Sequence, residues 1–81
     1  MKLYDGKTQN AYVVRSVTVD EAITRRLEAL GVNENTQIFI LNKKQSGTMI
    51  IKVRGTRLAL GRKITGGIHV EEVAEDGTER K

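Results

Sequence analysis

The chain has 81 residues and a formal net charge of +4, so it can form one domain with a small core. It contains no cysteine, which excludes a disulfide framework and thiolate metal sites. The N-terminus turns polar at once, and no apolar run approaches the roughly 20 residues of a membrane-spanning helix. We therefore expect a soluble, cytoplasmic protein. The charge is uneven, because residues 1–70 carry an excess of Lys and Arg while residues 71–81 are acidic.

The first predicted elements are a strand at residues 11–17, rich in β-branched side chains, and a helix directly after it. Thr18 and Glu21 have the spacing of a capping box at the start of this helix. The apolar residues that follow recur at helical spacing and predict one buried stripe: Ile23, Leu27 and Leu30. Gly31 can then adopt the left-handed conformation that ends a helix.

Four further strands are predicted where apolar runs are separated by turn residues, at 36–42, 48–54, 56–61 and 68–73. The run at 36–42 is nearly all apolar, as in a strand covered on both faces. Gly55 is expected to close a hairpin. Five short strands this closely spaced predict a mostly β fold, a small five-stranded antiparallel barrel with one helix inserted after the first strand. An open α+β sheet fits the same pattern nearly as well.

These elements define a single predicted domain at residues 1–74. Residues 75–81 contain no apolar side chain, and we expect them to form a mobile acidic tail. A basic body with an acidic tail favours a polyanionic partner, although an ordinary solvated surface explains the same charges.

Catalytic residues are not indicated by the sequence. There is one histidine, and the only serines, Ser16 and Ser46, fall in a predicted strand and a predicted turn. A Ser–His or Cys–His mechanism needs a base beside the nucleophile. The glycine-rich stretch at 61–67 carries a basic pair but lacks the residue order of a phosphate-binding loop. We therefore predict that the protein is not an enzyme.

His69 and Glu71 are the candidates for a metal site, because residues two apart share one face of a strand. Such a pair could hold one transition metal ion if water or another molecule completed the coordination. The competing interpretation is an exposed histidine beside an acid, and no firm cofactor is predicted.

Basic residues between positions 43 and 63 fall on or beside adjacent predicted strands, a pattern that small RNA-binding barrels also show. Such barrels stack bases on aromatic side chains. The aromatics here are Tyr4, Tyr12 and Phe39, and Phe39 is expected in the core. Nucleic-acid binding is therefore a less favoured interpretation.

Two stretches of the sequence carry a recognisable pattern: residues 25–32, RRLEALGV, at the predicted helix end, and residues 53–62, VRGTRLALGR, at the predicted hairpin. They resemble the helix end and the hairpin of the family of ferrous-iron transport protein A, FeoA. Residues 68–70, IHV, look like its closing strand. The resemblance runs from Leu3 to Val73 and implies an SH3-like barrel, which is similar also to a module of iron-dependent repressors.

The resemblance implies a non-enzymatic accessory role in ferrous iron uptake, with no catalytic residue carried over. The implied partner is the cytosolic part of a FeoB-type membrane iron transporter with a GTPase domain, which would recruit the protein to the inner face of the plasma membrane. The candidate partner-binding residues lie in the two matching stretches: Arg25, Arg26, Leu27, Leu30, Gly31, Arg54, Gly55, Arg57 and Leu60. The alternative function is a metal-responsive regulatory module that binds iron or another transition metal ion.

Overall fold

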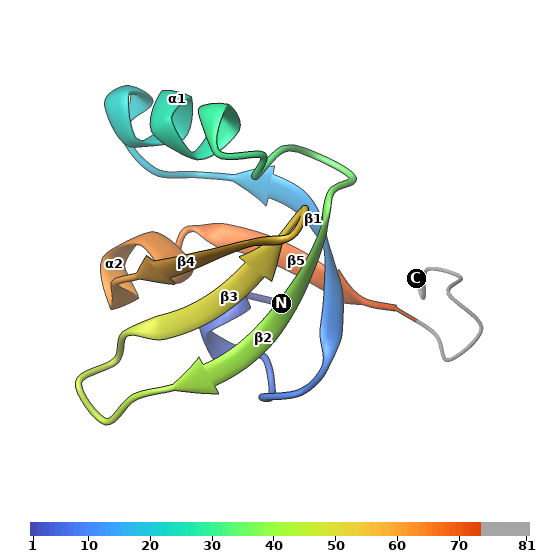
Figure 1. Cartoon of the computed structure of the whole chain (residues 1–81). Helices are drawn as coiled ribbons and strands as arrows, with labels where there is room; N and C mark the ends of the chain where they lie inside the picture. The colour runs from blue at the N-terminus through green and yellow to red at the C-terminus, as the bar shows by residue number, and fades with distance from the viewer. Residues whose placement is uncertain (74–81) are drawn as a thin grey trace.

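The computed structural model describes residues 1–73, and the predicted tail at 75–81 lies outside the described residues. Five strands form one antiparallel sheet, and a helix follows the first strand, as predicted (Figure 1). In chain order the elements are η1 (Leu3–Asp5), β1 (Ala11–Val17), α1 (Glu21–Ala29), β2 (Gln37–Lys43), β3 (Met49–Val53), β4 (Thr56–Leu60), α2 (Arg62–Thr65) and β5 (Ile68–Glu72). None of the helices within residues 1–73 is long and apolar enough to cross a membrane.

The strands are ordered β4-β3-β2-β1-β5, so β2, β3 and β4 form a meander and β5 returns beside β1. The sheet is not closed, because β4 and β5 lie at its two ends and the chain between them forms α2. The expectation of a closed barrel therefore needs correction. Register shifts at Arg15 and Leu41 interrupt the pairing of β1 and β2 with their neighbours, and such bulges bend a sheet without closing it.

One face of the sheet buries the core. Its members come from η1, from all five strands and from α1 and the loop after it: Leu3, Tyr12, Val14, Leu27, Val32, Ile38, Ile40, Met49, Ile51, Val53, Leu60, Ile68 and Val70. In β2, Ile38 and Ile40 are fully buried, whereas Phe39 and Leu41 on the other face are only half-buried. The prediction that this strand is covered on both faces, with Phe39 in the core, is therefore wrong.

The hairpin between β3 and β4 forms as predicted. Arg54 and Gly55 are the two turn residues, with φ of 50° and 82°, and Val53 pairs with Thr56 on either side of them. Positive φ at both central residues matches the twist of antiparallel strands, and glycine adopts it at least cost.

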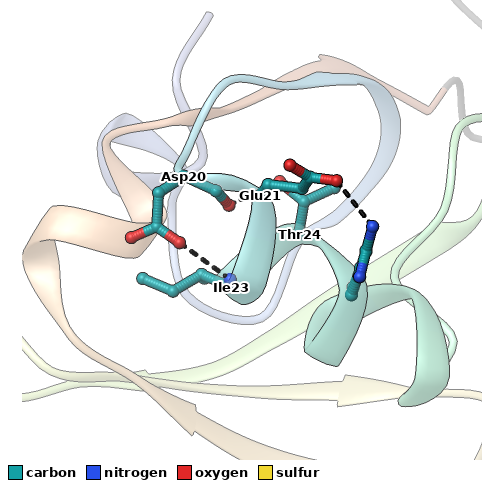
Figure 2. Close-up of polar contacts among 5 residues, drawn as sticks. Asp20, Glu21, Ile23 and Thr24 are labelled. Atoms are coloured by element: carbon teal, nitrogen blue, oxygen red, sulfur yellow. Dashed lines mark hydrogen bonds and ion pairs between the residues drawn. The ribbon is translucent and has the colours of Figure 1, made fainter.

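The helix α1 begins differently from the prediction. Its N-cap is Asp20, whose carboxylate accepts a hydrogen bond from the backbone N–H of Ile23 at 2.9 Å (Figure 2). The expected capping box is wrong, because the Thr18 hydroxyl instead donates to the carbonyl of Gly67 at 3.1 Å, and Glu21 pairs with Arg25 at 2.6 Å. The end of the helix is as predicted, with Gly31 at a φ of 97°.

Candidate functional site

A groove of about 190 Å³ lies between α1, β4 and α2. Its lining is apolar except for one arginine: Ile23, Arg26, Leu27, Leu30, Leu58, Ala59, Leu60 and Ile64. The alternation of β4 aims Leu58 and Leu60 toward the core face, and α1 contributes one side of its surface at helical spacing. We call this feature the α1–β4 groove.

Leu30 is the exposed apolar residue of the α1–β4 groove. The predicted buried stripe of α1 is only partly correct, because Leu27 is 3% exposed and Ile23 is half-buried, whereas Leu30 is 45% exposed. Leu30 is the C-cap residue of α1 and lines the groove. Leu30 is thus the most exposed large apolar side chain of the groove lining.

The charge of the groove is positive. Arg26 lines it, and Arg62 and Lys63 flank Ile64 in α2. No acidic side chain belongs to the residues that line it. The lining of the α1–β4 groove therefore combines apolar side chains with positive charge.

The structure brings part of the predicted partner-binding set together. Arg26, Leu27, Leu30 and Leu60 all line the α1–β4 groove, although they come from both matching stretches. Leu27 and Leu60 are buried and belong to the core, as predicted for Leu27.

Gly31 and Arg54 connect the end of α1 to the β3–β4 turn. A Cβ placed on Gly31 would lie 3.0 Å from Cδ of Arg54 and 3.5 Å from Cγ1 of Val53, so the helix end lies directly against the turn. This close approach and the positive φ both explain why glycine stands at position 31. Gly31 and Arg54 hold the end of α1 beside the β3–β4 turn but are not among the residues that line the groove.

The remaining predicted residues lie away from the groove. Arg25 is exposed and paired with Glu21, and a Cβ on Gly55 would meet no atom within 4 Å. Arg57 is exposed on the opposite face of β4 from Leu58 and Leu60, where it is the register partner of Lys52.

Sequence reasoning missed the contribution of α2. Ile64 lines the groove from this four-residue helix, which is too short to produce a helical period. The available signal was that Ile64 is the single large apolar residue between Gly61 and the Gly66–Gly67 pair. Leu58 and Ala59 were assigned to a strand but not to the site.

The predicted metal pair occupies one face of β5. Glu71 forms an ion pair with Arg15, with 3.1 Å between Oε2 and Nε, and His69 is half-buried beside it in the strand. No group of three or more His, Cys, Asp or Glu side chains within residues 1–73 is arranged to hold a metal ion.

Ser16 and His69 are register partners on β1 and β5, which is the nearest approach to a nucleophile–base pair. No hydrogen bond joins their side chains within the described part of the chain. Ser16 instead lines a second, more polar hollow of about 330 Å³ between β1 and α1, together with Glu28 and Glu34.

A family model described as FeoA domain matches residues 1–72. The chain belongs to the FeoA family. This membership connects it to ferrous iron uptake, and members of the family with this SH3-like fold are generally non-catalytic accessory domains. No curated protein matches the chain.

Solved structures of other FeoA proteins share the fold. The FeoA protein from Chlorobium tepidum is 29% identical with a TM-score of 0.86, over 91% of this chain and 71% of that one. A FeoA-like protein from Clostridium acetobutylicum is 22% identical with a TM-score of 0.79, over 93% of this chain and 88% of that one. The SH3-like character predicted from the resemblance is thus confirmed, with an open sheet.

The fold also occurs as a part of a larger regulator. A manganese-dependent transcriptional repressor in complex with manganese is 16% identical with a TM-score of 0.82, over 89% of this chain but only 36% of the repressor. At this identity the likeness concerns the fold.

Proposed function

We propose that this FeoA-family protein is a cytoplasmic, non-enzymatic accessory protein of ferrous iron uptake. It binds the cytosolic part of a FeoB-type membrane iron transporter through the α1–β4 groove. The observation that supports the proposal is Leu30, which is 45% exposed at an apolar groove of a FeoA-family domain.

A partner that covers the groove buries apolar surface that is exposed to water in the isolated domain. Fully burying a leucine side chain contributes about 1.5–3 kcal/mol, so covering the exposed part of Leu30 gives roughly 1 kcal/mol. Leu58, Ile64 and Ile23 are half-buried around it and supply further apolar area. A partner side chain of similar size therefore finds an apolar site whose walls already belong to the core.

Arg26 adds charge to this contact. Its side chain lines the groove and is exposed, and Arg62 and Lys63 lie on the adjacent α2. Positive charge at the edge of an apolar contact speeds association with an acidic partner segment and disfavours basic partners. The partner surface is accordingly an apolar anchor with acidic residues beside it.

The experiment measures calorimetric binding of the full chain to the purified cytosolic GTPase part of the FeoB-type transporter from the same cell. Leu30→Glu should weaken binding at least about tenfold, because it places a charge in an apolar contact. Ala22→Glu is the matched control, since Ala22 is exposed on α1 outside the groove and the substitution adds the same charge.

The control should bind within about twofold of the wild type. Equal binding by both variants would show that the groove is not the contact. Absence of binding by the folded wild-type chain would contradict the transporter as partner.

A further inference from the structure

A second surface gathers positive charge around one tyrosine. Nζ of Lys43 lies 5.0 Å, and Cζ of Arg62 lies 4.8 Å, from the centroid of the Tyr4 ring. Nζ of Lys43 also donates a hydrogen bond to the backbone carbonyl of Tyr4 at 2.7 Å. Two cations from distant parts of the chain are thus held at one half-buried aromatic ring.

Three parts of the chain meet at this ring: η1, the end of β2 at Lys43 with the turn after it, and α2. Arg62 connects the last two, because a Cβ on Gly47 in the turn would lie 3.4 Å from Cβ of Arg62. Lys44 and Lys63 are exposed and directly follow Lys43 and Arg62 in the chain, and Lys2 and Lys7 flank η1 in sequence. We call this surface the basic end, and its cations are Lys2, Lys7, Lys43, Lys44, Arg62 and Lys63.

The net positive charge of the described chain is located at the basic end. The segments that form it carry six Lys or Arg and one acid, Asp5. The rest of residues 1–73 carries six basic and six acidic side chains. Neither Lys44 nor Lys63 forms an ion pair with another described residue. Charges of one sign repel within the Debye length of about 8 Å, so this concentration favours an anionic partner.

We propose that the basic end binds the anionic lipid headgroups of a membrane surface. Such a surface attracts clustered Lys and Arg near it without requiring a shaped pocket. Five of the six cations are lysines, and those other than Lys43 act as flexible point charges suited to mobile headgroups rather than as rigid forks for one ligand.

The aromatic residues disfavour nucleic acid as the partner. Single-stranded nucleic acids stack their bases on free aromatic faces. The Tyr4 ring is already engaged by two cations, and Tyr12 is 1% exposed. Phe39 is half-buried on β2, at the register of Ala11 and Lys52.

The position of the basic end also suits this contact. In Figure 1, α1 lies on the opposite side of the molecule from the β2–β3 turn. Docking of the basic end on a membrane therefore leaves α1 uncovered.

The test is co-sedimentation of the full chain with vesicles of phosphatidylcholine alone or of phosphatidylcholine mixed with phosphatidylglycerol. Binding is expected only to the anionic vesicles. It should fall steeply when NaCl is raised from about 0.1 M to about 1 M, because the Debye length shortens from about 10 Å to about 3 Å.

Two double variants with the same change in net charge locate the contact. Lys44→Glu with Lys63→Glu should weaken binding by about 25-fold or more, since each lysine contributes about fivefold near an anionic surface. Lys52→Glu with Arg57→Glu is the control, because both residues are exposed and face each other on β3 and β4, outside the basic end. The control should weaken binding by less than about threefold.

Three results would overturn the proposal. The chain could fail to bind anionic vesicles, the two double variants could lose binding equally, or a single-stranded oligonucleotide could bind more tightly than the vesicles at the same salt. No transporter is present in this experiment, so its outcome does not depend on the α1–β4 groove.

Discussion

The α1–β4 groove and the basic end differ in what lies over their apolar side chains. In the groove, Leu30 remains 45% exposed, with a single arginine among the lining residues. At the basic end, two cations lie over the Tyr4 ring. Apolar contacts persist in salt, whereas contacts between exposed charges are screened by it. One small fold therefore offers two surfaces that can be separated by experiment.

The largest expected effect is on the free energy of unfolding, and it distinguishes the buried from the exposed leucine of the groove. Leu27→Ala should lower the free energy of unfolding by about 2–5 kcal/mol, because it leaves a cavity in the core. Leu30→Ala should change it by no more than about 0.5 kcal/mol, because that side chain is half in water. Urea denaturation measures both, and a large loss for Leu30→Ala would mean that Leu30 supports the fold rather than a contact.

At the basic end, the substitution to test is one that removes the Tyr4 ring, which contacts the two cations. Tyr4→Leu should cost about 1–2 kcal/mol of stability, since two cation–π contacts at a partly exposed site are lost. Tyr4→Phe keeps the ring and serves as the control, with an expected change within about 0.5 kcal/mol. If both variants lose the same stability in thermal unfolding, the hydroxyl rather than the ring organises the basic end.

A smaller effect is expected at the start of α1, the helix that forms one wall of the groove. Asp20→Ala should cost about 1 kcal/mol, because the N-cap bond to Ile23 is lost. Glu21→Ala should cost only about 0.3–0.5 kcal/mol, because it breaks one exposed pair with Arg25. The reverse order of the two losses in urea denaturation would restore the predicted capping role of Glu21.

The smallest effect concerns the charge at the groove. Arg26→Gln should slow association with the transporter's cytosolic part by about two- to fivefold, since it removes a charge at the edge of the contact. Arg57→Gln should leave the rate unchanged, because Arg57 is not among the residues that line the groove. Stopped-flow kinetics would contradict the assignment if Arg57→Gln slowed association as much as Arg26→Gln did.

Local signals in the sequence predicted most of the fold. The range 11–17 for β1 is correct, and Gly31 and Gly55 have the positive φ values that their turns require. The capping prediction failed because two residues could cap α1, and tertiary structure engages the Thr18 hydroxyl with Gly67 instead. Whether the sheet closes also depends on α2. This helix has only four residues, between glycines, and is too short to show a sequence pattern.

The candidate site was predictable only in part, for a related physical reason. Helical spacing places Leu27 and Leu30 on neighbouring positions of one face, but it does not say how far the sheet covers that face. The structure covers Leu27 and leaves Leu30 exposed. The basic end was not predictable either, because the residues around Tyr4 are brought together by η1, the β2–β3 turn and α2 from distant positions.

The most direct test of the account is an NMR titration of the isotope-labelled chain with the cytosolic part of the FeoB-type transporter. We expect the amide signals of residues 26–31, 58–60 and 64 to shift, because they form or adjoin the α1–β4 groove. The signals of Lys44 and of Phe39 should stay in place. Shifts confined to the outer face of the sheet or to the basic end would contradict the claim that the groove is the partner site.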